Sequence, residues 1–465
     1  MEETGDVTKE KAKKNTPESK KQENNQTTTD VRGLILDILL EILEKDSYSH
    51  MVLKQALDKY QYLEKQDRAL ITKVTEGVLE YLIQIDYVIE LYSSIKISKM
   101  KPLIRTLLRM SVYQILYLDR IPDSAVCNEA VKLAKKRRFQ GLSGFVNGVL
   151  RTISREKENL NFPDDSIRYS APWWLINLWK ESYPEETVRE MLGSFLEKSR
   201  LSVRCNLEKA DKEQIIHSLK QQGVKVWDSG YLEAILYLEG IDYLEALEAF
   251  QKGWIFVQDL SSSLVALAVA PQKGSYCIDV CGAPGGKALH LADLLSGTGT
   301  VEVRDINEHK VELIQENIRR SGFSNIKSKI WDAFVLDQDS VEKADLVLAD
   351  LPCSGLGVIG RKPDIKRRMS LEAMEELAKL QREILSVVWK YVKPGGTLVY
   401  STCTVNQKEN EDNARWFTQN FPFRTVNIER RLGEKLKSET MRQGYIQLLP
   451  GKPCDGFFLA VFERI

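Results

Sequence analysis

Short apolar runs alternate with amphipathic stretches through residues 254–465, and this alternation restricts the fold more than any other feature of the sequence. The apolar runs predict strands, at residues 276–280, 300–304, 327–330, 346–349, 397–400 and 456–462. Helical patterns stand between them, at residues 288–295, 311–318 and 371–391. Such a chain forms a parallel sheet with helices on both faces, and its ligand site lies at the carboxyl ends of the strands. We therefore expect a doubly wound α/β domain.

The chain has 465 residues, too many for one ordinary domain, and its N-terminal part has a different pattern. Residues 1–30 hold hardly any large apolar side chain, so we expect a disordered tail. Apolar residues then recur at three-to-four spacing, which predicts an all-α domain over residues 31–160. After a proline-bearing break, residues 161–253 mix short helices with strands such as 201–206, which indicates a small α+β module.

Two of the predicted strands end close to a cysteine. Asp350 and Cys353 follow the run 346–349, and Cys403 follows the run 397–400. If these strands are neighbours in one sheet, two thiols and one carboxylate face the same crevice. A cysteine in a protein core is ordinarily a small apolar residue. Both of these cysteines stand at polar strand ends, which favours a chemical role.

A glycine-rich turn follows the first predicted strand of the α/β domain. The turn consists of Cys281, Gly282, Ala283, Pro284, Gly285, Gly286 and Lys287. A phosphate-binding P-loop needs Gly at 281 and Ser or Thr at 288, where this chain has Cys281 and Ala288. The dinucleotide fingerprint Gly-x-Gly-x-x-Gly also fails, because Gly282, Gly285 and Gly286 have the wrong spacing. We expect the turn to approach a ligand that carries no pyrophosphate.

Acidic residues end three of the predicted strands. They are Asp305, Asp332 and Asp350. Asp305, at the end of the second strand, suits the diol of a ribose. Each acid alone could equally be a helix N-cap, but capping does not readily explain acids at successive strand ends. Because a ring of acids without a phosphate cradle suits a cationic nucleoside, we expect S-adenosylmethionine as the cofactor.

Two thiols and an acid beside a methyl donor suit methylation at carbon 5 of a pyrimidine. Carbon 5 is a poor nucleophile, but addition of a thiolate to carbon 6 makes an enamine that can attack a sulfonium methyl group. An ordinary cysteine, with a pKa of about 8.5, is only a few per cent thiolate at neutral pH and needs help. A carboxyl group bound to the ring nitrogen and exocyclic amine draws charge from carbon 6, and Asp350 is placed for this. The base must also leave its stack to reach such a site.

With these motifs the chain resembles the RNA 5-methylcytosine methyltransferases, and specifically the bacterial small-subunit ribosomal RNA methyltransferase B (RsmB) family. The residues that carry the resemblance in the catalytic part are 281–287, 350–359, 361–366, 400–404 and 409–411. In the helical part, residues 107–114 and 144–151 resemble a NusB-like RNA-binding domain. The resemblance implies a multidomain enzyme, a 16S rRNA (cytosine-C5)-methyltransferase with a Rossmann-like catalytic domain and small-subunit ribosomal RNA as its partner.

The resemblance also implies a role for each motif residue. It makes Cys403 the nucleophile and Cys353 the thiol that assists release. Asp350 faces the base, and the cofactor pocket takes its acids from Asp305, Asp332 and Asp350, with Lys287 closing the turn. DNA cytosine methyltransferases attack with the cysteine of a Pro-Cys pair, which here is Cys353. The additional Thr402-Cys403 pair is what indicates the RNA branch. The chain departs from the usual pattern at Gly282, Arg304, Leu351 and Cys454.

Two basic stretches are candidate RNA contacts. Residues 131–155 contain seven Lys and Arg and no acid, a composition that fits a solvated helix face or, with the NusB likeness, an RNA contact. A second group follows the Pro-Cys turn and is expected to track the RNA backbone: Arg361, Lys362, Lys366, Arg367 and Arg368. Trp173, Trp174 and Trp179 could stack on bases, although aromatic residues near a domain boundary are more often core.

Composition sets the remaining expectations. The formal net charge is zero, so any RNA site must be a local patch. Seven cysteines without disulfide spacing indicate a reducing compartment, and four dispersed histidines indicate no zinc site. Without a signal peptide or a membrane-length apolar run, we expect a cytoplasmic protein that is a monomer and binds no membrane. A non-catalytic RNA-binding or assembly factor remains an alternative, and the glycine spacing disfavours a nicotinamide-dependent dehydrogenase.

Overall fold

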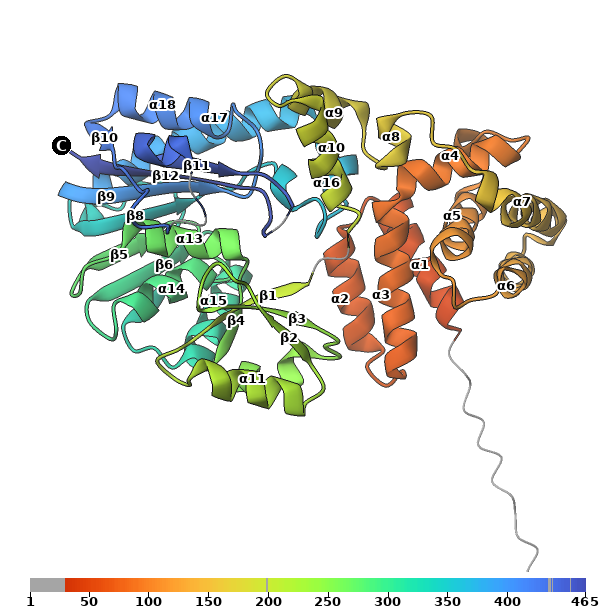
Figure 1. The fold of residues 1–465 in the computed structure, drawn as a ribbon, viewed down its shortest axis with the longest axis horizontal. Helices are drawn as coiled ribbons and strands as arrows, with labels where there is room; N and C mark the ends of the chain where they lie inside the picture. The colour runs from red at the N-terminus through yellow and green to blue at the C-terminus, as the bar shows by residue number, and fades with distance from the viewer. Residues whose placement is uncertain (1–29, 198–199, 434–435, 437, 452) are drawn as a thin grey trace, which may run out of the picture.

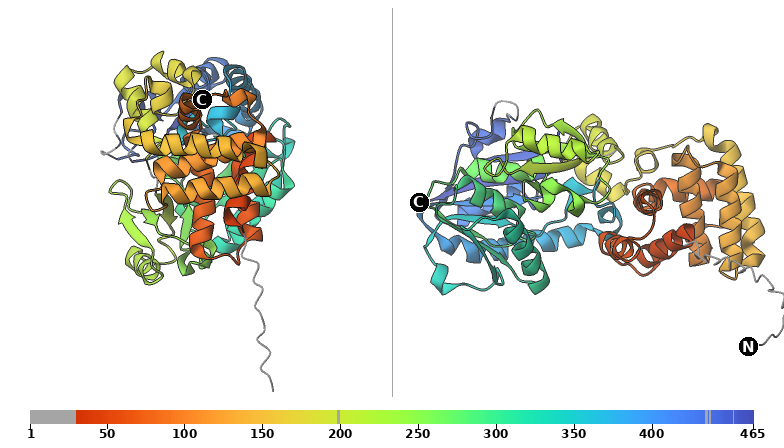
Figure 2. Two further views of the ribbon diagram at one scale, coloured as in Figure 1. Left: turned by 90° about the vertical axis from the view of Figure 1, so that its right-hand side faces the viewer. Right: turned by 90° about the horizontal axis from the view of Figure 1, so that it is seen from below.

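The computed structural model describes residues 30–465 except 198, 199, 434, 435, 437 and 452. The disordered tail was expected at residues 1–30, and all of it except residue 30 lies outside the described residues. Figure 1 shows a helical lobe, a small sheet with a helix against it, and a larger sheet flanked by helices. Figure 2 shows from two further sides that the helical lobe forms one end of an elongated molecule.

The helical lobe is built around one buried helix. Its helices are α1 (Val31–Glu44), α2 (Ser49–Lys59), α3 (Lys65–Glu80), α4 (Leu82–Tyr92), α5 (Pro102–Tyr117), α6 (Asp123–Lys136) and α7 (Ser143–Glu156). α5 contacts α1, α3, α4, α6 and α7, and its residues 106–115 are all buried. The apolar residues of α1 that recur every three to four positions, such as Ile35, Leu39 and Ile42, are fully buried against it. The predicted all-α fold is confirmed.

A small module follows the helical lobe. It begins with the helices α8 (Asp165–Arg168), α9 (Trp173–Lys180) and α10 (Glu185–Ser194). The remaining elements are β1 (Leu201–Cys205), α11 (Lys212–Gln221), β2 (Lys225–Asp228), β3 (Ile235–Glu239), α12 (Glu248–Gln251) and β4 (Ile255–Val257). The strands form an antiparallel sheet in the order β2-β3-β1-β4. The predicted α+β fold is confirmed, including the strand expected near residue 201.

Of the three tryptophans near the start of this module, Trp179 serves packing, whereas Trp173 is 49% exposed. The Trp179 side chain is 1% exposed, and its indole Nε1 donates to the Val405 carbonyl at 2.9 Å. α9 and α10 share a core with Leu356, Ile359 and Met374 of the catalytic domain. Stacking of Trp179 on an RNA base is therefore wrong, because the ring is already buried between two parts of the protein.

The catalytic domain alternates strands and helices as expected. Its first half contains α13 (Leu260–Val269), β5 (Tyr276–Asp279), α14 (Gly286–Leu294), β6 (Thr300–Asp305), α15 (Glu308–Ser321) and β7 (Ile326–Ile330). Its second half contains β8 (Ala344–Asp350), α16 (Ile365–Arg368), α17 (Leu371–Val388), β9 (Val392–Thr402), α18 (Glu411–Asn420), β10 (Phe423–Thr425), β11 (Tyr445–Leu448) and β12 (Phe457–Arg464). Figure 1 shows helices on both sides of this sheet.

The order of the strands identifies where a ligand can bind. The sheet runs β10-β12-β9-β8-β5-β6-β7, with β11 also paired to β12. Strands β5 to β9 are parallel, whereas β12 is antiparallel to β9, so the sheet is mixed. The chain order reverses between β5 and β8, and in open α/β sheets the crevice at such a point binds the ligand.

Among the residues that the structure describes, no helix has both the length and the apolar character needed to cross a bilayer. Over the same residues, no three or more His, Cys, Asp or Glu side chains come together in a group that could hold a metal ion.

Candidate active site

The carboxyl ends of β8 and β9 bring the two predicted cysteines together. The strands are parallel neighbours, and their register places Asp350 beside Ser401. Both strands continue into loops at the same edge of the sheet. There the sulfur atoms of Cys353 and Cys403 lie 3.4 Å apart. The structure therefore brings the two thiols together at the edge of the sheet where β8 ends at Asp350.

The two thiols of this pair differ in acidity. The hydrogen bond from Cys353 lowers the pKa of Cys403, and the same contact together with burial raises the pKa of Cys353. Burial and Asp350 oppose the shift at Cys403, while Lys287 adds to it. Cys403 is therefore the better candidate for a thiolate, and Cys353 is the better candidate for the thiol that keeps its proton.

Asp350 is held by an ion pair and a hydroxyl group. Lys287 Nζ lies 2.7 Å from Asp350 Oδ2, and Ser401 Oγ donates to Asp350 Oδ1 at 2.7 Å. Burial alone would lower the pKa of Lys287, but Asp350 outweighs burial and the pKa lies above its ordinary value. Lys287 is therefore charged. Lys287 and Asp350 both act electrostatically on the Cys403 thiol, which places the pair near the sulfur atoms.

The glycine-rich turn lies against the end of β6. The backbone N–H of Gly282 donates to the Arg304 carbonyl at 2.8 Å, and that of Ala283 donates to Asp305 Oδ2 at 3.4 Å. Gly285 has a φ of +103°, which a residue with a side chain rarely adopts. The chain can therefore turn sharply into α14, which begins at Gly286, and Lys287 follows with its side chain directed to Asp350.

The other predicted cofactor residues occupy different surroundings. Asp305 ends β6 and is 6% exposed. Asp332 follows β7 and accepts a hydrogen bond from the Phe334 N–H at 2.9 Å, as an acid in a turn does. The carbonyl of Pro284 is held by an asparagine of α15. Burial, followed by nearby acids, raises the pKa of Cys281, so this thiol can line the pocket but is no nucleophile.

Asp279 is a further acid of this site, and the sequence interpretation gave it no role. It ends β5 and is 1% exposed, and within the described part of the chain neither of its carboxylate oxygens has a hydrogen-bond partner. Burial, and then the charge of Asp350, raises the pKa of Asp279 to about 8. A buried polar group without a partner is costly unless a ligand satisfies it. Its position directly before the glycine-rich turn is the sequence signal that could have identified it.

The acids and the turn together fit S-adenosylmethionine. Asp279, Asp305 and Asp350 lie close enough for their charges to act on one another. Such a set of acceptors matches a ligand with a sulfonium, an ammonium and a ribose diol. The oxygen atoms of the Asp279 carboxyl can therefore accept hydrogen bonds from a ligand.

Glu409 is a second residue whose importance the sequence did not show. It is fully buried and accepts hydrogen bonds from Ser354 N at 2.9 Å, Gln381 Nε2 at 3.0 Å and Asn406 Nδ2 at 2.8 Å. The Ser354 hydroxyl also donates to it. Because Ser354 follows Cys353, and Asn406 lies three residues after Cys403, Glu409 ties together the two loops that carry the thiols.

Arg304, one of the departures from the family pattern, lies outside the pocket. Its guanidinium is 1% exposed and forms ion pairs with Glu302 at 2.5 Å and Asp337 at 3.0 Å. It also donates to the Ser340 hydroxyl at 2.6 Å. Successive residues of a strand point to opposite faces, so Arg304 faces away while Asp305 remains available to the turn.

The basic group after the Pro-Cys turn has a different role from the expected RNA track. Four of its five members bind other parts of the protein, and the prediction is wrong for them. Arg361 pairs with Asp259 and Asp455, Lys366 donates to the carbonyls of Glu80 and Ser170, Arg367 donates to the Ile42 carbonyl, and Arg368 donates to the Asp46 carbonyl. The contacts of Lys366, Arg367 and Arg368 fasten the catalytic domain to the helical lobe, whereas those of Arg361 lie within the catalytic domain. An isolated stretch of sequence cannot show which surface its cations will meet.

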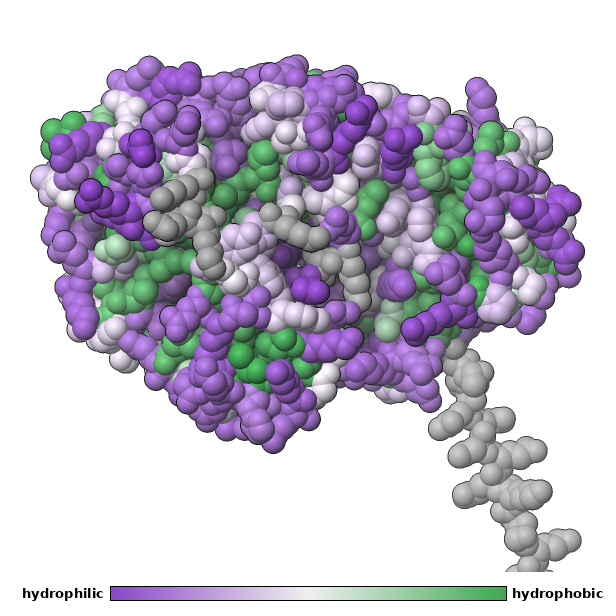
Figure 3. Space-filling model, in the orientation of Figure 1, coloured by the Kyte–Doolittle hydropathy of each residue, from purple (hydrophilic) through white to green (hydrophobic). Residues whose placement is uncertain are grey.

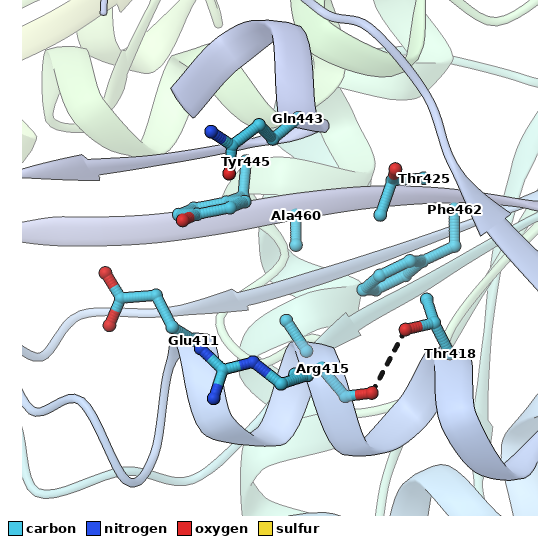
Figure 4. Close-up of a pocket in the computed structure, with 9 residues that line it drawn as sticks. Glu411, Arg415, Thr418, Thr425, Gln443, Tyr445, Ala460 and Phe462 are labelled. Atoms are coloured by element: carbon cyan, nitrogen blue, oxygen red, sulfur yellow. Dashed lines mark hydrogen bonds between the residues drawn. The ribbon is translucent and has the colours of Figure 1, made fainter. Parts of the chain in front are cut away.

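A separate hollow lies at the antiparallel edge of the large sheet. Figure 4 shows it between α18 and strands β11 and β12, with Glu411 and Arg415 on one side and Tyr445 and Phe462 on the other. Its volume is about 220 Å³. The residues that line it include neither thiol and no part of the glycine-rich turn, so it belongs to a different part of the domain.

The mixed α/β sheet, the acid-ringed glycine turn and the thiols at the switch point define an S-adenosylmethionine-dependent methyltransferase. Family models match three parts of the chain: the NusB family at residues 29–155, the ferredoxin-like domain of RsmF/B-like methyltransferases at 171–242, and the 16S rRNA methyltransferase RsmB/F at 266–463. The chain belongs to the ribosomal RNA small subunit methyltransferase B family.

Individual relatives support this membership over nearly the whole length. The probable ribosomal RNA small subunit methyltransferase B of Bacillus subtilis is 37% identical and covers 94% of this chain and 99% of its own. The ribosomal RNA small subunit methyltransferase B of Salmonella paratyphi B is 31% identical, and the match covers 95% of this chain and 99% of the relative. The crystal structure of PH0851 is 27% identical with a TM-score of 0.78, covering 93% of this chain and 98% of that one. NSun6 from Pyrococcus horikoshii shares the fold. It is 24% identical with a TM-score of 0.57, and the match covers 63% of this chain and 98% of that one.

Proposed function

We propose that this methyltransferase modifies carbon 5 of a cytosine in 16S ribosomal RNA through a covalent adduct with Cys403. The observation that carries the proposal is the pair of sulfur atoms 3.4 Å apart beside the Asp350–Lys287 ion pair. Membership of the family supports the RNA substrate, since the named relatives are small-subunit ribosomal RNA methyltransferases. A single thiol would be enough for attack, whereas a second one in contact with it suits release.

The first role of the site is to form and direct the nucleophile. The Cys353 hydrogen bond and the Lys287 charge favour the thiolate of Cys403, which adds to carbon 6 of the base. Asp350, fixed by Lys287 and Ser401, faces the ring nitrogen and the exocyclic amine of the base, and a proton held between the carboxyl group and the ring nitrogen takes up the charge as the bond forms. The addition turns carbon 5 into an enamine carbon, which is nucleophilic enough to accept a methyl group.

The second role is to hold the cofactor and to let the product leave. Bound S-adenosylmethionine supplies an electrophilic sulfonium methyl group. The turn 281–287 with Asp279, Asp305 and Asp332 would hold it. After methylation, carbon 5 loses its proton to a water molecule, the electron pair of that bond restores the ring double bond, and the bond between carbon 6 and Cys403 breaks with its electrons on the sulfur. Cys353 can then donate its S–H to the departing thiolate over the observed 3.4 Å.

The function is tested by incubating the protein with methyl-labelled S-adenosylmethionine and protein-free small-subunit ribosomal RNA. Digestion of the RNA to nucleosides should give labelled 5-methylcytidine and no other labelled nucleoside. Labelled N4-methylcytidine or a methylated uridine would contradict the assigned chemistry. A protein that keeps the pocket only as a relic would bind no cofactor at micromolar concentration in a calorimeter.

Asp279 makes cofactor binding depend on pH. With a pKa raised to about 8, Asp279 is mostly protonated at neutral pH in the free protein. A cationic ligand favours the carboxylate and lowers this pKa, so binding should release close to one proton near neutral pH. The release should fall towards zero above the raised pKa, and affinity should rise with pH up to that point.

Calorimetry in buffers of different ionisation enthalpy measures this proton release. Asp279→Asn should abolish the release and weaken binding, whereas Asp339→Asn, the matched control, should keep both because Asp339 is exposed and belongs to no part of the cofactor site. Binding by the unaltered protein with no proton released would show that Asp279 does not face the cofactor.

A further inference from the structure

The start of α2 in the helical lobe is fastened to the catalytic domain. The backbone N–H of Ser49 donates to Asp364 Oδ2 at 2.7 Å, and the guanidinium of Arg368 lies 3.8 Å from the centre of the Tyr48 ring. Figure 1 shows this end of α2 close to α16. The contacts join residues more than 300 positions apart, so the position of Tyr48 relative to the catalytic domain is fixed by folding.

A short segment of chain connects Asp364, which binds the start of α2, to the loop that carries Cys403. The Gly357 N–H donates to the Cys403 carbonyl at 3.1 Å, and the Lys362 N–H donates to the Val358 carbonyl at 2.9 Å. Lys362 therefore lies about one turn of chain from the loop that holds the nucleophile, and two residues before Asp364. Its ammonium acts electrostatically on both Cys403 and His50, so it lies within electrostatic range of the active site and of α2.

The side chains at this end of α2 leave an aromatic surface uncovered. Tyr48 is 51% exposed although Arg368 stacks on it, and Met51, one turn further on, is also 51% exposed. The His50 ring centre is 5.7 Å from that of Tyr48. Figure 3 shows one face of the molecule, on which hydrophilic residues predominate and hydrophobic residues form smaller patches.

The charges around this surface favour a nucleic acid over an apolar protein partner. Lys362 is exposed, whereas Arg368 is already bound to Asp46. The nearby acids are already engaged, since Asp46 pairs with Arg367 and Arg368, and Asp364 is 7% exposed and binds Ser49. An aromatic ring with neighbouring cations is the arrangement that binds unpaired nucleotides, the base on the ring and the phosphate on the cation.

We propose that Tyr48, His50 and Lys362 form a binding site for an unpaired nucleotide that neighbours the target cytosine. The base stacks on the uncovered side of Tyr48, beside His50, and Lys362 binds a phosphate of the strand that leads into the active site. The inference rests on the proposed function, because the target base must be turned out of its stack, which leaves its neighbours free to be held. The helical lobe would thereby fix which cytosine enters.

The test compares Tyr48→Leu with Tyr48→Trp and with Tyr62→Leu in the full-length protein. Tyr62 is also an exposed aromatic residue, but it lies beyond the far end of α2, about 16 Å away along an 11-residue helix. Affinity for a fluorescent single-stranded fragment of small-subunit ribosomal RNA is measured by anisotropy, and KM and kcat are measured on the same fragment.

Tyr48→Leu should weaken RNA affinity and raise KM about tenfold, with kcat and cofactor affinity within about twofold. Tyr48→Trp should bind as the unaltered protein does, and Tyr62→Leu should show no change. Lys362→Gln should lower RNA affinity. It should also reduce the slope of log affinity against log salt concentration by the amount expected for about one phosphate contact. Thermal unfolding of each variant identifies any loss that comes from the fold.

The outcomes separate this site from the catalytic proposal. If Tyr48→Leu and Lys362→Gln both bind RNA as tightly as Tyr62→Leu does while methylation proceeds, the nucleotide site is refuted and the function stands. If both variants lose RNA affinity but the unaltered protein forms no 5-methylcytidine, the site stands and the proposed function is refuted.

Discussion

Replacing Cys403 with alanine is expected to lower the rate of methylation by about 10⁴-fold or more, because the reaction then has no group to add to carbon 6. Affinity for RNA and for S-adenosylmethionine should change by less than about twofold, since the Asp350–Lys287 pair and the glycine-rich turn remain. The measurement is single-turnover methylation with saturating protein, which isolates the chemical steps from product release.

A buried cysteine in the helical lobe provides the matched control. Cys127 in α6 is 3% exposed and far from the thiol pair in the sequence, so Cys127→Ala should keep full activity. Retention of more than a few per cent of activity by Cys403→Ala would exclude Cys403 as the nucleophile. If Cys353→Ala alone lost activity without forming an adduct, the roles of the two cysteines would be reversed.

Glu409→Ala is expected to have the largest effect on stability. The substitution leaves three buried donors, on Ser354, Gln381 and Asn406, without their acceptor. Each unsatisfied buried donor costs about 1–3 kcal/mol, so the free energy of unfolding should fall by about 4 kcal/mol. Activity should fall about 100-fold in the molecules that remain folded, because the loops carrying Cys353 and Cys403 lose the residue that joins them.

Denaturant unfolding and initial rates measure the two effects of Glu409→Ala. Glu409→Gln should be milder, since the amide keeps the shape and one acceptor oxygen. Glu383→Ala is the matched control, because Glu383 is an exposed glutamate on α17, two residues from Gln381, and should change stability by less than about 0.5 kcal/mol. Equal stability of Glu409→Ala and Glu383→Ala would show that the buried network does not hold the loops.

The sequence was sufficient to predict the elements whose pattern is local. Apolar runs set the positions of β5 to β9, and the two runs followed by Asp350 and by Cys403 proved to be parallel neighbours. The glycine-rich turn was recognisable because Gly285 must adopt a positive φ there. The fold class and the meeting of the thiols could therefore be expected from residue spacing and strand order.

Properties that depend on distant partners could not be predicted in the same way. Lys366 and Arg368 looked like RNA contacts, but their partners lie in the helical lobe hundreds of residues earlier. The position of Asp279 two residues before the glycine-rich turn is visible in the sequence, but spacing does not reveal that its carboxyl lacks a hydrogen-bond partner in the described structure. Glu409 derives its importance from donors on three separate segments. The antiparallel direction of β12 likewise depends on its pairing with β9, which lies far from it in the sequence.

The central claim is that the Cys403 sulfur binds carbon 6 of the cytosine while Cys353 assists its release. The most direct measurement uses Cys353→Ala with RNA and S-adenosylmethionine, followed by mass spectrometry of any RNA adduct that survives denaturation. The account predicts an adduct that accumulates and contains the peptide with Cys403 bonded to a methylated cytidine. No adduct, or an adduct on any other residue, would contradict it.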